Sequence, residues 1–190
     1  MHKAPGKARV HGNLGKALLD AGHYAAAIEA FQRALALDPK LLGAYSNLAV
    51  IFIDHLHQYE PARAYLHAAL AIQPRYPEAH LNLGVIALNQ GDLPSAIAAF
   101  TEVLRLVPSH LLAHYNLAAC YINQRDCPRA LAVLERGLAY WPAAARLYLL
   151  KSRAYQWLNN LPEARKALAR AYALQPHDAE VQRYYQRLRE

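Results

Sequence analysis

The fold of this chain is decided by residues 77–110, which read PEAHLNLGVIALNQGDLPSAIAAFTEVLRLVPSH. Similar stretches precede and follow this one at a nearly fixed interval. The interval is clearest in five prolines, which are spaced by 35, 34, 34 and 34 residues: Pro39, Pro74, Pro108, Pro142 and Pro176. Such a period is typical of stacked repeats, in which each unit buries its apolar surface against a neighbour. The 190 residues therefore predict one elongated domain of five units, 8–41, 42–76, 77–110, 111–144 and 145–178.

Each unit carries two helical patterns. In the first unit, Leu14 and Leu18 belong to one apolar stripe with helical spacing, and residues 27–35 carry a second stripe. Gly22 lies between the stripes and suits the positive φ that ends a helix. The second stripe ends before Pro39, because proline restricts the preceding residue and has no N–H to donate. Each unit is thus expected to be a helical hairpin.

Two places in every unit are reserved for small side chains. In the first helix they are Gly15, Ala49, Gly84, Ala118 and Ser152, and in the second helix Ala27, Ala62, Ala96, Ala130 and Ala164. Small side chains allow the two helices of a hairpin to approach closely. Large residues beside them are expected to fill the space between successive hairpins: Leu14, Leu48, Leu83 and Leu117.

This pattern resembles the tetratricopeptide repeat, a helix–turn–helix unit of 34 residues. The third unit carries the signature as His80, Leu83, Gly84, Leu93, Ala96, Phe100, Val103 and Pro108. The resemblance covers residues 8–178. It implies an all-α, right-handed solenoid (a superhelix) that acts as a non-catalytic scaffold and binds a partner protein or peptide in its concave groove.

The sequence departs from the repeat in the second and fifth units. The second unit has one extra residue, which is most simply placed in the turn around Asp54–Gln58, and the fifth has Lys151 and Ser152 where Leu-Gly is expected. At the ends, residues 1–7 are expected to form a tail and residues 179–190 a capping helix. Asp178 is the expected N-cap of that helix. Its expected apolar side is formed by Val181, Tyr184, Tyr185 and Leu188.

The composition bears on the location of the protein, its source and the state of its cysteines. No apolar run approaches 18 residues, so no membrane span is expected, and the basic start of the chain lacks the apolar segment of a secretory signal. A cytoplasmic location is therefore expected, with the reservation that a signal can be removed beforehand. The content of Ala, Leu, Arg and Gln points to a bacterial source. Cys120 and Cys127 are interpreted as two small buried thiols, with a disulfide as the alternative.

Asparagine recurs in register at the sixth place of four units, as Asn13, Asn47, Asn82 and Asn116. The resemblance places these first-helix residues along the concave groove. An amide both donates and accepts hydrogen bonds, so a ladder of amides suits the backbone of an extended peptide. Each bond contributes only about 0.5–1.5 kcal/mol, so several are needed. The alternative is that these amides only satisfy backbone groups within the stack.

Apolar residues on the same helix faces are expected to form the floor of the groove. The residues chosen for this role are Val50, Leu81, Val85, Leu88, Tyr115 and Ile122. In the fifth unit the character changes to Arg146, Arg153 and Trp157. Since arginine pairs with carboxylates, the acidic end of a bound peptide is expected near this unit.

Other functions are weighed against this hypothesis. The net charge of +7 is concentrated in residues 111–190, which carry +6. A structural subunit that self-associates into an oligomer, or that docks by this basic half on an acidic partner, an anionic membrane or nucleic acid, is therefore kept as the alternative. Nucleic acid is the least favoured partner, because no basic arm or alternation of basic and aromatic residues is present. The sequence has no catalytic motif, and its HxH pair, His55 and His57, lacks a third metal ligand, so no enzyme activity and no cofactor are expected.

Overall fold

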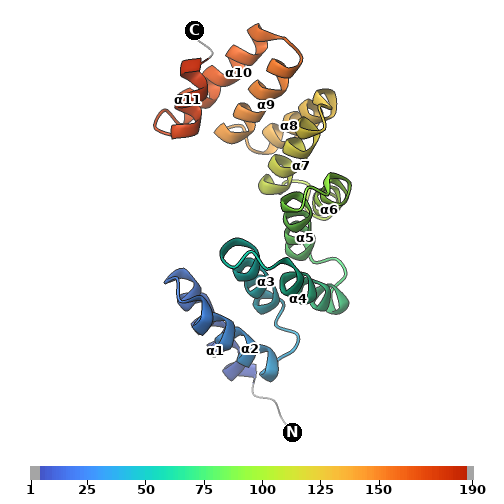
Figure 1. Cartoon of the computed structure of the whole chain (residues 1–190), viewed down its shortest axis with the longest axis vertical. Helices are drawn as coiled ribbons and strands as arrows, with labels where there is room; N and C mark the ends of the chain where they lie inside the picture. Colours follow the sequence, from blue (N-terminus) through green and yellow to red (C-terminus); the bar gives the residue numbers. More distant parts are fainter. Residues whose placement is uncertain (1–4, 188–190) are drawn as a thin grey trace. The chain divides into compact units, whose positions relative to one another are not determined.

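The computed structural model describes residues 5–187, and all regular structure within that range is helical (Figure 1). The chain forms two compact units, one up to Gln90 and the other from Gly91 onward. The division falls in the turn of the third repeat, where Gly91 takes a positive φ of 78°.

The first unit contains five α-helices and one π-helical segment within its described residues. They are α1 (Pro5–Asp20), α2 (Tyr24–Leu37), α3 (Leu42–Val50), η1 (Ile51–His55), α4 (Tyr59–Ile72) and α5 (Pro77–Asn89). The described part of the second unit contains α6 (Leu93–Leu106), α7 (Leu111–Asn123), α8 (Cys127–Tyr140), α9 (Ala145–Trp157), α10 (Leu161–Leu174) and α11 (Ala179–Arg187). Within the units, neighbouring helices pack as hairpins, such as α1 with α2, α3 with α4, α7 with α8 and α9 with α10.

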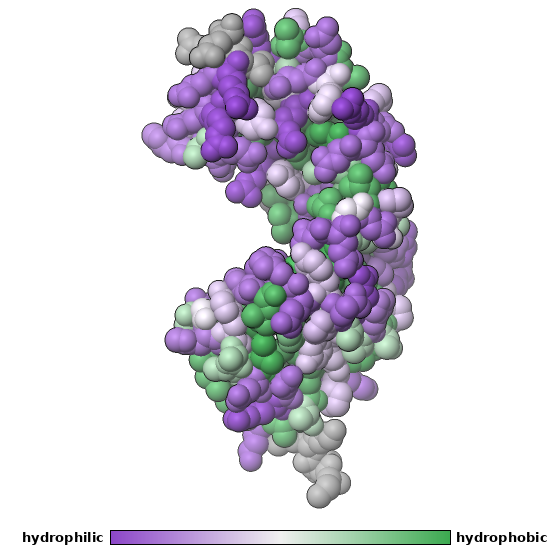
Figure 2. All heavy atoms as spheres, viewed as in Figure 1, coloured by the Kyte–Doolittle hydropathy of each residue, from purple (hydrophilic) through white to green (hydrophobic). Residues whose placement is uncertain are grey.

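The small residues in the repeat allow this close packing, as the sequence predicts. Ala27, Ala62, Ala96, Ala130 and Ala164 are all 0% exposed. On α1, a Cβ added to Gly15 would lie only 2.8 Å from the ring of Phe31 on α2. The core is therefore a series of helix interfaces rather than a single centre. On the face shown in Figure 2, small groups of apolar residues lie among hydrophilic ones in both units.

The loops that lead from one repeat to the next are closed by a recurring hydrogen bond that the sequence pattern alone did not reveal. The polar side chain at the fourth place of a repeat bonds to the carbonyl oxygen of the proline six residues earlier. Tyr45 Oη donates to Pro39 O at 3.1 Å, and His80 Nε2 lies 2.9 Å from Pro74 O. His114 Nε2 lies 2.9 Å from Pro108 O, and Gln182 Nε2 donates to Pro176 O at 2.7 Å. The place thus selects a side chain that is flat and also polar.

The extra residue of the second repeat lies mainly in a helix, which corrects its predicted place in the turn. The first helices of the third, fourth and fifth repeats have 13 residues each. In the second repeat, nine α-helical residues are followed by five π-helical ones, Ile51–His55. Leu56 N donates to Ile51 O at 3.1 Å, the spacing of a π turn. The wider turn absorbs one residue without changing the connection to α4.

The ends of the described chain differ from each other. Helix α1 begins at Pro5, so residues 5–7 are helical and do not form the expected tail. Leu14 is 48% exposed, so the prediction that it fills a space between hairpins is wrong for the part of the chain that the structure describes. At the other end, Asp178 Oδ1 accepts hydrogen bonds from the backbone N–H groups of Glu180 and Val181 at 2.9 and 3.0 Å. Val181 is buried against α10, whereas Leu188 and Arg189 lie outside the described residues.

Candidate functional site

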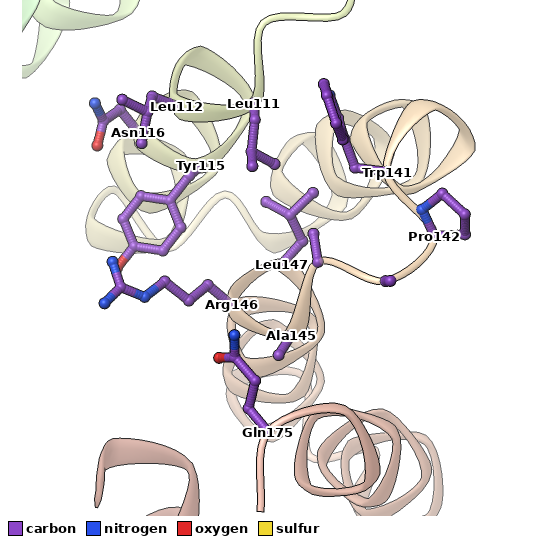
Figure 3. Close-up of a pocket in the computed structure, with 12 residues that line it drawn as sticks. Leu111, Leu112, Tyr115, Asn116, Trp141, Pro142, Ala145, Arg146, Leu147 and Gln175 are labelled. Carbon is purple, nitrogen blue, oxygen red and sulfur yellow. The ribbon is translucent and has the colours of Figure 1, made fainter. Parts of the chain in front are cut away.

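The second unit contains a pocket of about 510 Å³ between the start of α7, the loop before α9 and the start of α9 (Figure 3). Its wall is mainly apolar, with four polar side chains from α7, α9 and the loop after α10. The polar residues are Tyr115, Asn116, Arg146 and Gln175. The apolar lining consists of Leu111, Leu112, Trp141, Pro142, residues 143–145 and Leu147.

The loop before α9 is held in place by its own side chains and by the neighbouring loop. Trp141 follows the last turn of α8, and its indole Nε1 donates to Ser109 O at 2.7 Å. Its ring is nevertheless 44% exposed and forms part of the pocket wall. His110 caps α7 by accepting the backbone N–H of Ala113 at its Nδ1, at 3.3 Å. The two loops therefore fix the rim of the pocket on the α7 side and on the α9 side.

The helices below the pocket are tightly packed around His114. This residue is 0% exposed, and its two ring nitrogens lie 3.2 Å from Val133 O and 2.9 Å from Pro108 O. A Cβ added to Gly137 on α8 would lie 3.0 Å from His114 and from Leu147. Leu147 is itself fully buried at the base of the pocket. His114 is thus a structural residue.

The pocket combines apolar surface with one cation. Arg146 is exposed and forms no ion pair with any residue from 5 to 187. Leu112, in the wall of the same pocket, is 54% exposed. A guanidinium without an acidic partner can pair with a carboxylate in two hydrogen bonds. The chemistry of the pocket therefore suits a ligand with a large apolar group and a negative charge close to it.

Several residues expected in the site lie on the first unit. Asn13 is exposed on α1, whereas Asn47 on α3 and Asn82 on α5 are half-buried. Val50 lies on α3, and the other expected apolar contacts on α5 are also half-buried: Leu81, Val85 and Leu88. Helices α3 and α5 pack against each other, so these side chains belong to neighbouring elements of one unit.

In the second unit the expected residues separate into three groups. Tyr115, Asn116 and Arg146 share the pocket described above. Arg153 and Trp157 instead line another hollow, of about 380 Å³, with Gln156 and Tyr184.

Ile122 is 2% exposed, so the expectation that it contacts a ligand is wrong. Helix α7 turns this side chain toward the interior of the repeat. Trp157 is 54% exposed and is covered on one face by the guanidinium of Arg125, 4.6 Å from the ring centroid.

The sequence reasoning missed the part of the pocket that comes from loops. Trp141, Pro142 and Gln175 lie outside the first helices, to which the expected groove was confined. One signal was available for Trp141. The residue before the loop proline is Asp38 in the first repeat and Gln73 in the second, so an indole at this place is unusual for the chain.

The two cysteines are buried and free, as expected for structural thiols. Burial raises the pKa of Cys120 to about 11. Burial and, to a smaller extent, the charge of Asp126 raise the pKa of Cys127 above its ordinary value. Both thiols are therefore protonated at neutral pH and are poor nucleophiles. The described residues contain no group of three or more His, Cys, Asp or Glu side chains placed to hold a metal ion.

The chain belongs to the tetratricopeptide repeat family. Models of this repeat match residues 8–41, 56–110, 87–139 and 124–188.

Within residues 5–187 no helix is long and apolar enough to cross a membrane.

Comparison with known proteins gives the same fold. A thermophilic tetratricopeptide repeat protein of Thermus thermophilus superposes with a TM-score of 0.74 and 23% identity, covering 95% of this chain and 98% of the other. YrrB, described as a repeat protein with an unusual peptide-binding site, superposes with a TM-score of 0.72 and 18% identity, covering 93% and 90%. BBSome complex member BBS4 of Mus musculus is 32% identical over 94 residues, which are 50% of this chain and 18% of that protein. The chain thus spans less than a fifth of the length of this curated relative.

Proposed function

We propose that this protein is a non-catalytic interaction scaffold whose second unit binds a peptide segment of a partner protein in the pocket between α7 and α9. The observation that carries the proposal is the convergence of Tyr115, Asn116 and Arg146 with the exposed ring of Trp141 around one pocket. Protein interaction is the general role of this repeat family, and a structural neighbour is described as having a peptide-binding site.

The segment that fits this pocket carries a large apolar side chain followed or preceded by a carboxylate. The apolar side chain enters between Leu112, Trp141 and Ala145, where its burial provides most of the binding free energy. The carboxylate pairs with Arg146, and Asn116 and Tyr115 offer hydrogen bonds to the peptide backbone. This chemistry gives the peptide a direction, because its acidic end faces α9.

The first unit contributes to the same function in our proposal through Asn47 on α3 and Asn82 on α5. Both are half-buried and flanked by apolar side chains of the same helices. Hydrogen bonds from two amides are worth only about 1–3 kcal/mol together, so this surface is expected to extend an interaction rather than to create one. Simultaneous substitution of Asn47, Asn82 and Asn116 by alanine should weaken partner binding more than Asn116→Ala alone.

Binding to the pocket is best tested with a random peptide library displayed on phage and selected on the intact protein. The enriched peptides should share a large apolar residue next to an acidic residue or a terminal carboxylate. A synthetic consensus peptide then gives Kd values by fluorescence anisotropy. Arg146→Glu should raise Kd about tenfold or more, because a charge-assisted hydrogen bond is replaced by repulsion.

The matched control is Arg165→Glu, which makes the same change of charge at an exposed position of α10 outside this pocket. This variant should bind the peptide as the unmodified protein does. Equal weakening by the two substitutions would show that net charge, and not the pocket, governs binding. Enrichment of peptides without acidic groups, or binding that is unaffected by Arg146→Glu, would refute the proposed site.

A further inference from the structure

The turn between α9 and α10 carries apolar side chains where the equivalent turns of the second unit are polar. It begins with Trp157 and Leu158, which are 54% and 46% exposed. Leu161, the first residue of α10, is 46% exposed as well. The third and fourth repeats have asparagine and glutamine at the places of Trp157 and Leu158, namely Asn89, Gln90, Asn123 and Gln124.

The exposure of Trp157 and Leu158 is a property of their place in the repeat. All four of the equivalent asparagine and glutamine residues are exposed too. Those residues belong to the third and fourth repeats, each of which is followed by a further repeat. The two apolar side chains therefore face solvent at a place that a following repeat does not cover.

The backbone of this turn does not require apolar side chains. Leu158 N donates to the carbonyl oxygen four residues earlier at 3.2 Å, and Asn159 N to the one three residues earlier at 2.9 Å. Gln124 and Arg125 form the same two bonds in the fourth repeat, at 3.0 and 2.9 Å. The φ values of Asn159 and Arg125 are also similar, 56° and 60°. Asparagine and glutamine thus support the same turn, so the apolar pair is not needed for folding.

Positive charges surround the exposed indole. The guanidinium of Arg125 lies over the ring of Trp157, 4.6 Å from its centroid. Arg153 and Tyr184 line one hollow together with this indole, and Arg183 is exposed directly before Tyr184 on α11. None of the three arginines forms an ion pair with another described residue. Apolar side chains and unneutralised cations therefore occur together at this turn.

The outer face of α10 extends the positive charge away from the turn. Three cations are exposed along this helix: Arg165, Lys166 and Arg170. Its one acidic residue, Glu163, is half-buried and pairs with Lys166 at 3.8 Å. The equivalent helices α2, α4 and α8 instead each expose a glutamate, namely Glu29, Glu60 and Glu135.

This combination suits the surface of a bilayer that contains anionic lipid. The apolar side chains stand on a turn, in a run of exposed residues from Trp157 to Pro162. A protein partner would need a cavity that matches this turn, whereas a bilayer needs none. Tryptophan is favoured between lipid headgroups and acyl chains, and arginine and lysine are attracted by the negative surface potential. Residues 111–190 carry twelve Lys and Arg and six Asp and Glu, a net charge of +6 that favours the same surface.

We infer that the turn between α9 and α10 docks on a bilayer of anionic lipid. Trp157 and Leu158 enter the headgroup region, while Arg125, Arg153 and the outer face of α10 pair with lipid phosphates. The inference does not rest on the proposed peptide site, because that pocket lies at the start of α9 and the turn follows its end.

The first test transfers the polar residues of the fourth repeat to this turn. The intact protein should sediment with vesicles made of equal parts phosphatidylcholine and phosphatidylglycerol. Trp157→Asn combined with Leu158→Gln should weaken this binding about tenfold or more, because the apolar anchor is lost. The control is Ile72→Asn, at a residue of α4 that is 39% exposed, which should bind as the intact protein does. Circular dichroism establishes that each variant is folded.

The second test concerns the cations. Arg125→Gln combined with Arg153→Gln should weaken binding to the same vesicles several-fold and reduce its dependence on salt. Lys40→Gln combined with Arg75→Gln removes two charges at exposed positions of the first unit and is the matched control. The control should bind almost as the intact protein does. Equal weakening by the two pairs would show attraction by net charge alone and would overturn the inference.

The third test asks whether Trp157 itself enters the bilayer. Lipids with brominated acyl chains should quench part of the tryptophan fluorescence of the intact protein. Trp157→Phe should still bind the vesicles but should lose this quenching, because Trp141 is then the remaining indole. Quenching that persists in this variant would refute insertion of the turn. Binding that is equally strong to pure phosphatidylcholine, absent from anionic vesicles, or unaffected by the asparagine–glutamine pair would overturn the inference as a whole.

Discussion

The tight contact between α1 and α2 predicts that Gly15→Ala destabilises the first unit. An added Cβ would lie 2.8 Å from two ring atoms of Phe31 and 3.0 Å from a third. Carbon atoms do not normally approach so closely, and Phe31 is 1% exposed and enclosed by the core around Ala27 and Leu48. The ring has no solvent to move into. Relief of the clash therefore requires that α1 and α2 separate.

The expected magnitude is the difference between two opposing effects. Replacement of glycine by alanine within a helix stabilises it by about 0.5–1 kcal/mol. Insertion of a methyl group into a packed core costs about 1–3 kcal/mol. The two effects nearly cancel when the clash costs only about 1 kcal/mol. The change in the free energy of unfolding must therefore be compared with that of a second Gly→Ala variant in the same helix.

Gly12→Ala on the same helix is that control. An added Cβ there would lie 3.2 Å from Leu41 Cδ2, the mobile end of a half-buried side chain that can shift by a few tenths of an ångström. The helical preference contributes about equally to both variants and cancels in their comparison. Gly15→Ala should therefore be less stable than Gly12→Ala by about 1–3 kcal/mol.

The assay is urea unfolding followed by circular dichroism at 222 nm, with hydrogen exchange to locate the effect. Repeat units unfold partly independently. The loss of stability should therefore appear in the unfolding transition of α1 and α2, and the amide hydrogens of α9 and α10 should remain protected from exchange. If Gly15→Ala proves as stable as Gly12→Ala, the close contact with Phe31 does not constrain this repeat, and the proposed reason for a small residue at this place is refuted.

Two further predictions concern the second unit. Because burial raises the pKa of Cys120 to about 11, this thiol should react with a disulfide reagent at pH 8 about a hundredfold more slowly than an exposed cysteine, and its rate should rise about tenfold per pH unit until it levels off near pH 11; a fast reaction at pH 8 in the folded protein would contradict its burial. Asp178→Ala should destabilise α11 by about 1 kcal/mol, because two backbone N–H groups lose their acceptor. Hydrogen exchange at Glu180 and Val181 measures this loss, and Glu180→Ala serves as the control because it removes the same charge but not the cap.

Local regularities made much of the fold predictable. The alanines from Ala27 to Ala164 recur because every hairpin has the same close contact, so a repeated sequence implies a repeated interface. Asp178 could be assigned as a cap because a helix N-terminus has unpaired N–H groups whatever surrounds it. Both features depend only on residues within about one repeat along the chain, so the repeated sequence pattern is sufficient to predict them.

The predictions that proved wrong have a common cause. Each depends on which neighbouring helix packs against the residue, and the repeat pattern does not contain that information. Leu14 and Leu48 occupy the same place in the repeat, yet one is 48% exposed and the other 0%. Helix α2 packs on α3 at Leu48, whereas no helix within residues 5–187 covers Leu14 in the same way. Ile122 was assigned to the binding surface because helical spacing gives an angle around α7, but the angle alone does not say which neighbour fills the space. The π turn at Ile51–His55 shows the same limit, because a one-residue insertion fits either a helix or a turn.

The candidate site was predicted only in part for a similar reason. Tyr115, Asn116 and Arg146 come from first helices and could be found by their register. Trp141 and Gln175 come from loops, where the repeat imposes proline but not its neighbour. Their contribution to the pocket depends on how α7, α9 and the two loops pack.

The sequence by itself determined the number of repeats, the helical hairpin of each, and the small residues at their contacts, because these follow from a period that every unit shares. Tertiary structure decided which members of each equivalent set are covered and which face solvent. It thereby separated Leu48 from Leu14 and placed Trp141 in one pocket with Tyr115 and Asn116 of α7. The physical reason is that a side chain is buried only where a second surface packs against its own. The repeat pattern of one helix does not show whether that second surface is present.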